Sequence, residues 1–158
     1  MSPQSPDKRP GEPPARPRGT LATRTLAMPA DANPSGDIFG GWVLSQMDIA
    51  GGITASARAA GRVATVAVDA MVFHRPVYVG DVLCTYADII RVGRTSIAIH
   101  IEAWALRSRL GERVKVTQGT FTLVAIDDAG RPRPVPPESA LAGEEPATRQ
   151  GAGEEPAA

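Results

Sequence analysis

Residues 42–60 read WVLSQMDIAGGITASARAA, and this stretch decides the fold class of the chain. Its apolar residues recur with helical spacing, which predicts an α-helix. They cover more than one side of that helix, so we expect it to be buried on most of its faces. The apolar positions are Trp42, Val43, Met47, Ile49, Ala50 and Ile53. Gly61 follows and is placed to end the helix, because glycine adopts the left-handed conformation found just after helix ends.

Strand-like runs lie on both sides of this helix in the sequence. Residues 95–104 alternate most cleanly, with Ile97, Ile99 and Ile101 on one face and His100 and Glu102 on the other. Turn residues separate the runs. The predicted strands are residues 21–28 before the helix and residues 63–73, 81–92, 95–107 and 114–126 after it.

One strand, one helix and four further strands make an α+β order. A doubly wound parallel sheet does not fit, because its parallel strands need helical crossovers that are missing between the later strands. We therefore expect a curved antiparallel sheet of about five strands wrapped around one long central helix. Such a sheet has two edges, which natural proteins cover. A dimer with joined edge strands is the expected solution.

The composition of the chain argues against several classes of function. The chain has 158 residues, which fits one domain. Lys+Arg and Asp+Glu are both 17, so no basic excess favours nucleic acid as a partner. Cys84 is the single cysteine, which excludes an intramolecular disulfide. The apolar runs are too short to span a membrane, and no apolar segment follows the basic N-terminal residues as in a secretory signal. We expect a cytoplasmic protein without a membrane partner.

Both ends of the chain have a different composition from the middle. Residues 1–19 are rich in Pro and Arg, and residues 137–158 are rich in Ala, Gly, Glu and Pro. Neither carries the apolar pattern needed to offset the entropy of ordering. We expect two disordered tails and one folded domain over residues 20–136.

Candidate site residues gather in the stretch DANPSGDIFGGWVLSQMDIAGG, residues 31–52. Asn33 lies in a polar loop, and Gly40 and Gly41 open the helix, where free backbone amides and the helix dipole favour a negative charge. Asp48 lies seven residues after Gly41, about two helical turns, and so returns to nearly the same face. An aspartate and two following glycines are unfavourable inside an apolar helix, which is typical of functional sites.

A structural interpretation of the same residues stays open at this point. Asp48 could simply accept hydrogen bonds from a neighbouring loop, and Asn33 could be an ordinary turn residue. A pair of glycines such as Gly40 and Gly41 often does no more than allow the chain to enter a helix tightly.

Four segments resemble the YciA-like acyl-CoA thioesterases of the hot-dog superfamily. They are NPSGDIFGGWVLSQMDIAGG (33–52), FHRPVYVGD (73–81), RVGRTSI (91–97) and TLVAIDDAGRPRPVP (122–136). The resemblance covers residues 21–136. It implies a helix wrapped by an antiparallel sheet, a homodimer with a continuous sheet, and often a trimer of such dimers. It also implies hydrolysis of acyl-CoA, in fatty acid metabolism, without a metal or a bound cofactor.

The resemblance assigns roles to the candidate residues. Asp48 corresponds to the family's catalytic carboxylate, acting as general base or as nucleophile. Asn33 corresponds to an asparagine used by related two-domain hydrolases, where it would orient the water or the carbonyl. Asp48 of one subunit would face Asn33, Gly40 and Gly41 of the other, with the thioester carbonyl on the Gly41 amide. Many relatives have histidine at the position of Phe39, so any role of that histidine is absent here.

The coenzyme A part of such a substrate needs cations for its phosphates. The turn containing Arg94, Thr95 and Ser96 is the best candidate, because a glycine turn with a free amide and hydroxyls can bind an anion. Single arginines at strand ends are, however, often only solvated. The further candidate cations are Arg75, Arg91, Lys115 and Arg131.

Two other functions are compatible with the same fold. A non-catalytic acyl-CoA or lipid sensor would not need the carboxylate of Asp48. A hot-dog dehydratase would need a catalytic histidine near the helix start, and none is present between Asn33 and Asp48. His74 and His100 are therefore interpreted as a pocket wall or as surface residues. Acyl chain length does not follow from the sequence.

Overall fold

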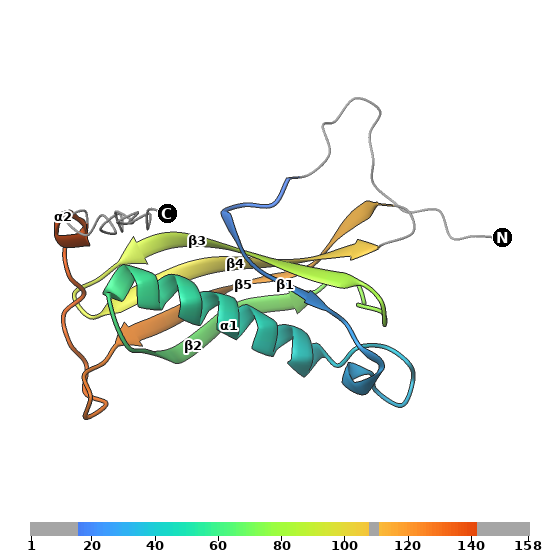
Figure 1. Cartoon of the computed structure of the whole chain (residues 1–158), viewed down its shortest axis with the longest axis horizontal. Coiled ribbons are helices and arrows are strands. Elements are labelled where there is room, and N and C mark those ends of the chain that lie inside the picture. The colour runs from blue at the N-terminus through green and yellow to red at the C-terminus, as the bar shows by residue number, and fades with distance from the viewer. Residues whose placement is uncertain (1–15, 108–110, 142–158) are drawn as a thin grey trace, which may run out of the picture.

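The computed structural model describes residues 16–107 and 111–141. Figure 1 shows one long helix lying across a twisted sheet. Each predicted helix and strand is present, with ends within two residues of the prediction. The order is β1 (Thr20–Leu26), the short 3₁₀ helix η1 (Pro29–Asp31), α1 (Gly40–Ala59), β2 (Val63–Phe73), β3 (Val82–Val92), β4 (Ser96–Arg107), β5 (Glu112–Ala125) and the short helix α2 (Glu138–Leu141).

The five strands form one antiparallel sheet in the order β1-β3-β4-β5-β2. This confirms the predicted α+β fold class. The two edge strands are β1 and β2, so each has a side that pairs with no strand among the described residues. The first strand reaches β3 only after the chain has passed along α1 and β2, a pairing that no local sequence pattern indicates.

The core lies between α1 and one face of the sheet. Ile97, Ile99 and Ile101 are buried against α1, as the alternation in β4 predicted. From the helix, Val43 and Met47 pack into the same cluster. Gly51 allows close contact, since a Cβ there would lie 3.1 Å from Ile101 Cδ1.

The expectation that α1 is buried on most faces is wrong for the single chain. Ile49 is 49 % exposed and Ile53 is 53 % exposed. The sheet covers only one side of the helix, so the apolar residues on the other side face outward. Leu44 belongs to the same outward surface.

The helix α1 ends where it was predicted to end, with Gly61 at the C′ position after the C-cap Ala60. The left-handed conformation, however, falls on Ala60, with φ of 49°. Gly61 is also needed for space, because a Cβ at this position would lie 2.6 Å from the guanidinium of Arg133. That guanidinium donates to the carbonyl of Ala59 at 2.8 Å and so satisfies an open acceptor at the helix end.

Among residues 16–107 and 111–141, no helix has both the length and the apolar character that a membrane crossing requires. The predicted disordered tails, residues 1–19 and 137–158, lie mostly outside the described residues and there stay a prediction. Within the described part of the second tail, Glu138–Leu141 forms the short helix α2, so this segment is not without structure as predicted.

Candidate active site

Asp48 lies in the middle of α1, on the side that faces away from the sheet core. Its carboxylate accepts a hydrogen bond from the hydroxyl of Thr65, with 2.6 Å between Oγ1 and Oδ1. Thr65 belongs to β2, which follows α1 in the chain and lies beside it. The hydroxyl fixes one carboxylate oxygen and leaves the other for a further partner.

Thr65 lies directly before a bulge in β2. Thr65 pairs with Leu123 and Ala67 pairs with Thr122, so Val66 is one extra residue in β2. Leu123 belongs to the core cluster under α1, and its pairing partner Thr65 therefore points to the helix side. The extra residue lets Thr65 and Val68, which pairs with Phe121, both face the helix, although strict alternation would place them on opposite faces. Thr65 is a site residue that the sequence alone did not indicate.

The start of α1 presents open backbone amides. Phe39 is the N-cap residue and provides no side-chain hydrogen bond to the first turn. Among the described residues, the amides of Gly40 and Gly41 donate to no acceptor. A Cβ at Gly41 would have no neighbour within 4 Å, so no side chain of the described residues crowds this position. Such a helix start can bind an anion or a developing oxyanion.

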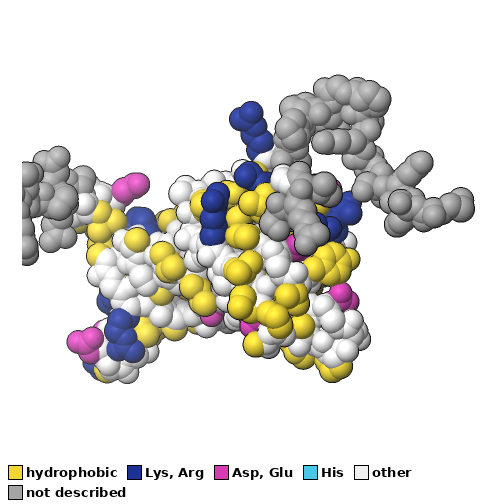
Figure 2. All heavy atoms as spheres, turned by 45° about the vertical axis from the view of Figure 1, so that its right-hand side comes forward, with side chains coloured by type: hydrophobic (Ala, Val, Ile, Leu, Met, Phe, Trp, Pro, Cys, Tyr) yellow, Lys and Arg dark blue, Asp and Glu magenta, His cyan; other side chains and the backbone are white. Residues whose placement is uncertain are grey.

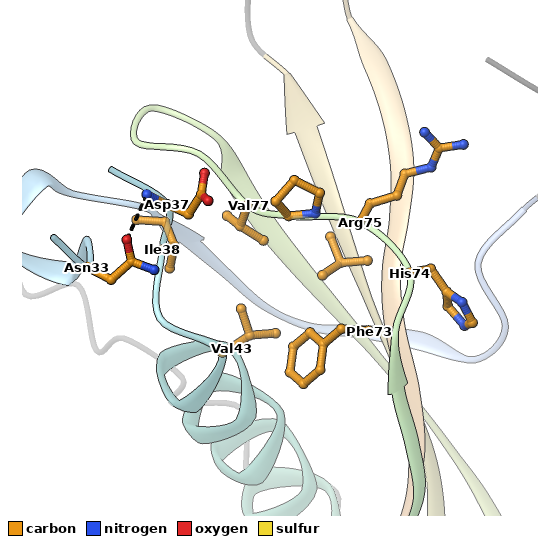
Figure 3. A pocket seen from close by; sticks show the side chains of 11 residues that line it. Asn33, Asp37, Ile38, Val43, Phe73, His74, Arg75 and Val77 are labelled. Carbon is orange, nitrogen blue, oxygen red and sulfur yellow. Dashed lines mark hydrogen bonds between the residues drawn. The ribbon is translucent and has the colours of Figure 1, made fainter. Parts of the chain in front are cut away.

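Asn33 stabilises the loop before α1 by hydrogen bonds within that loop. Its Oδ1 accepts hydrogen bonds from the amides of Ser35 (2.9 Å) and Asp37 (3.1 Å), the second drawn in Figure 3. The backbone amide of Asn33 donates to the carbonyl of Asp37 at 2.7 Å. The side-chain oxygen is therefore occupied, and the group that Asn33 can offer to a ligand is its NH₂, a donor.

A pocket of about 390 Å³ opens beside the start of α1 (Figure 3). It brings together Asn33 and Gly40 with Arg75, three residues that the sequence had indicated. The polar wall is completed by Asp37 and His74. The apolar wall consists of Ile38, Val43, Phe73, Pro76, Val77 and Val116.

Asp48 does not line this pocket. Eight residues separate it from Gly40, which is about 12 Å along a helix axis. Within one subunit the candidate catalytic residues thus form two groups, Asn33 with Gly40 and Asp48 with Thr65.

The candidate cations are also divided between the two ends of the molecule. Arg75 lies at the start of α1, whereas Arg91 at the end of β3 and Arg94 in the turn between β3 and β4 lie near the end of α1. In that turn the amide of Gly93 donates to the carbonyl of Ser96 at 2.7 Å, so it is not free for an anion. The neighbouring carbonyl of Thr95 accepts from the amide of Ala125. A helix of 20 residues is about 30 Å long, so the two groups are far apart.

Two further candidate cations are engaged in ion pairs. Lys115 Nζ lies 2.7 Å from Glu102 Oε1 on the outer face of the sheet, and Arg131 Nε lies 3.3 Å from Asp127 Oδ2. Trp104 Nε1 also donates to Glu102, at 2.8 Å. Burial raises the pKa of Glu102, but hydrogen bonds from Lys115, from Trp104 and from the amide of Arg18 outweigh this, and the net pKa is lowered.

The described residues contain no cluster of three or more His, Cys, Asp or Glu side chains able to hold a metal ion. Cys84 is buried and belongs to a small cluster with Tyr86 and Trp104. His74 lies on the pocket wall, and His100 Nε2 lies 3.4 Å from Glu102 Oε1.

One long helix on a five-stranded antiparallel sheet of this order is the hot-dog fold, which is also that of a hexameric thioesterase from Campylobacter jejuni, 38 % identical with a TM-score of 0.73 over 80 % of this chain and 96 % of the other. The model of the thioesterase superfamily matches residues 35–112.

Three relatives show to which group of the thioesterase superfamily the chain belongs. The acyl-CoA thioester hydrolase YciA of Salmonella typhimurium is 54 % identical over 76 % of this chain and 92 % of its own length. A hexameric thioesterase from Yersinia pestis is 55 % identical, with a TM-score of 0.75 over 77 % of this chain and 100 % of the other. A hexameric broad-specificity acyl-coenzyme A thioesterase, solved as an Asp-to-Ala mutant, is 49 % identical, with a TM-score of 0.74 over 79 % of this chain and 96 % of the other. The chain belongs to the YciA-like acyl-CoA thioesterases of the thioesterase superfamily.

Proposed function

We propose that this protein hydrolyses acyl-CoA thioesters to the free carboxylic acid and coenzyme A. The observation that carries the proposal is the outward carboxylate of Asp48, fixed by Thr65 on a helix whose first amides are open. The family relationship supports the same reaction, since its relatives are acyl-CoA thioester hydrolases. The cytoplasmic location expected from the sequence stays a prediction.

The active unit is a homodimer, because one subunit holds the two groups of catalytic residues too far apart to act on one carbonyl. The unpaired side of β2 offers the dimer contact, with Val66 60 % exposed and Val72 59 % exposed. The outward surface of α1, formed by Leu44, Ile49 and Ile53, lies beside this strand and extends the contact. On the face of the single chain that Figure 2 shows, many exposed side chains are hydrophobic. A trimer of such dimers is the proposed assembly, since two relatives are hexameric.

Asn33 and Gly41 of one subunit bind the thioester carbonyl oxygen. The NH₂ of Asn33 and the amide of Gly41 donate to this oxygen, and both stabilise the negative charge that develops on it. Gly40 has no side chain, which lets the backbone at the start of α1 approach the substrate closely. This assigns Asn33 to the carbonyl rather than to the water.

Asp48 of the partner subunit supplies the attacking group. As a general base it takes a proton from water, the hydroxide adds to the carbonyl carbon, and the tetrahedral intermediate expels the CoA thiolate, which then takes up that proton. As a nucleophile it adds to the carbonyl carbon itself, and the tetrahedral intermediate expels the CoA thiolate to leave a mixed anhydride; water then hydrolyses the anhydride, and the thiolate takes up the proton that water loses. Thr65 holds the carboxylate in either route. No step in either route requires a metal or a bound cofactor.

For the coenzyme A part, Arg75 is the cation proposed beside the pocket. Arg91, Arg94, Thr95 and Ser96 lie at the other end of α1 and would reach the same molecule only from another subunit. Replacing Arg75 by Gln and Arg94 by Gln separately should show which end binds the phosphates, through a rise in KM.

Release of free thiol from acetyl-, butyryl- and palmitoyl-CoA tests the function. We expect turnover by the wild type and a loss of at least about 100-fold in kcat for Asp48→Asn, which keeps the shape but removes the charge. Thr65→Val, an isosteric change, should lower kcat by about tenfold, whereas Thr122→Val on the other face of the sheet should not. Binding of butyryl-CoA by Asp48→Asn, measured by calorimetry, should persist.

Two results would contradict the proposal. Acyl-CoA binding by the wild type without thiol release would favour the non-catalytic sensor. Full activity of Asp48→Asn would remove Asp48 from the mechanism.

A further inference from the structure

The pocket beside the start of α1 has a polar side and an apolar interior. Asn33 and Gly40 lie on the polar side, where the proposed function has the thioester carbonyl. Behind them the walls are Val43, Val77 and Val116, which are only 2 %, 2 % and 0 % exposed. All three belong to the packed core, so the pocket ends against the core and does not continue through the molecule.

The apolar interior distinguishes the two parts of an acyl-CoA molecule. The arm of coenzyme A next to the sulfur carries two amide groups, and valine walls offer them no hydrogen bond, which makes their burial unfavourable. A hydrocarbon chain has no such requirement. Burying one methylene group improves binding by about fourfold. The interior therefore fits the acyl chain better than the coenzyme A arm.

Phe73 forms the one aromatic wall. It ends β2, and its ring lies 3.5 Å from the position that a Cβ at Gly40 would occupy. In Figure 3 the ring points into the space between β2 and the start of α1, beside Val43. Phe73 is 48 % exposed, so its size can change without opening the packed core, in contrast to the valine walls.

We infer that this pocket binds the acyl chain and that Phe73 sets the upper limit of its length. The inference rests on the proposed function and specifies its substrate class as short- and medium-chain acyl-CoA. An apolar cavity of about 150 Å³ holds benzene, so 390 Å³ has room for a chain on the order of ten carbon atoms. Activity should rise with each added methylene until the pocket is full and then stop rising.

The test is a panel of straight-chain acyl-CoA substrates from 2 to about 16 carbons. The readout is the ratio of kcat/KM for dodecanoyl-CoA to that for butyryl-CoA. Phe73→Ala should raise this ratio by at least about tenfold, the effect of two buried methylenes. Phe73→Trp should lower it. Leu26→Ala is the matched control, because Leu26 is 51 % exposed and does not line the pocket. Melting temperature and size-exclusion volume are measured for each variant.

Each outcome decides something different. A ratio that stays within twofold of the wild type in both Phe73 variants overturns the inference while the hydrolase function stands. No thiol release by the wild type from any member of the panel overturns the proposed function, and the inference with it. If Phe73→Ala does not fold, Phe73→Trp tests the inference alone: a lower kcat/KM ratio supports it, and an unchanged or higher ratio overturns it.

Discussion

The guanidinium of Arg107 lies over the ring of Tyr78, with its central carbon 4.8 Å from the ring centroid. The same group donates to the carbonyl of Pro76 at 3.0 Å and lies 3.5 Å from the carboxylate of Asp81. One side chain at the end of β4 therefore holds three points of the loop between β2 and β3. That loop supplies Pro76 and Val77 to the pocket.

Arg107→Met should loosen this loop, because the stem stays while all three polar contacts are lost. We expect the free energy of unfolding to fall by about 1–2 kcal/mol. KM for butyryl-CoA should rise more than kcat falls, since the catalytic residues are untouched. Urea denaturation and thiol release measure the two effects, with Arg107→Lys as an intermediate case. Unchanged stability and KM in the Met variant would show that the loop does not depend on Arg107.

Asn33→Asp separates the two roles of this side chain, which accepts hydrogen bonds from the loop and is proposed to donate one to the substrate carbonyl. A carboxylate still accepts hydrogen bonds from the amides of Ser35 and Asp37, so the loop should keep its shape. The NH₂ donor is lost, and kcat should fall by about 100- to 1,000-fold, as for removal of one oxyanion donor. Asn33→Ala should lose both stability and activity. Wild-type kcat in the Asp variant would exclude a donor role for Asn33.

Glu102→Gln should change how stability depends on pH. The lowered pKa of Glu102 means that the folded state favours the ionised form more than the unfolded state does. This stabilisation is present above the ordinary glutamate pKa of about 4.3 and is lost as the pH falls through the lower pKa of the folded state. The Gln variant should be less stable at pH 7 and should lose less between pH 5 and 3. Melting temperatures are measured for both proteins from pH 3 to 7. A decrease with falling pH that is equal in the two proteins would contradict this prediction.

Gly51 and Gly52 are adjacent but face different surroundings. A Cβ at Gly51 would lie 3.1 Å from Ile101 Cδ1, whereas a Cβ at Gly52 would have no neighbour within 4 Å in the single chain. Both alanine variants gain the same helix propensity. Gly51→Ala should therefore be less stable than Gly52→Ala by about 1–3 kcal/mol, the cost of overpacking. Equal stability in denaturant titrations would mean that Ile101 moves aside freely.

The sequence predicted those features that depend on local periodicity. β2 was predicted with its observed ends, and Ile97, Ile99 and Ile101 alternate as observed because a strand repeats every two residues. Strand order was not predictable, because the pairing of β2 with β5 joins segments that are distant in the chain.

The candidate site was predictable only in part. Asn33, Gly40 and Arg75 meet in one pocket because they flank the same helix start. Arg94 lies at the other end of the helix, a separation that only the register of β3 and β4 determines. Arg107 and Phe73 had no local signal, since each acts through a contact made across strands.

The extra residue at Val66 has a consequence for comparing sequences in this family. Thr65 and Val68 both face the helix, opposite Leu123 and Phe121, because Val66 interrupts the alternation between them. An alignment that placed a one-residue gap before Thr65 instead of at Val66 would shift the threonine by one position. Its hydroxyl would then be assigned to the outer face of the sheet, away from the carboxylate.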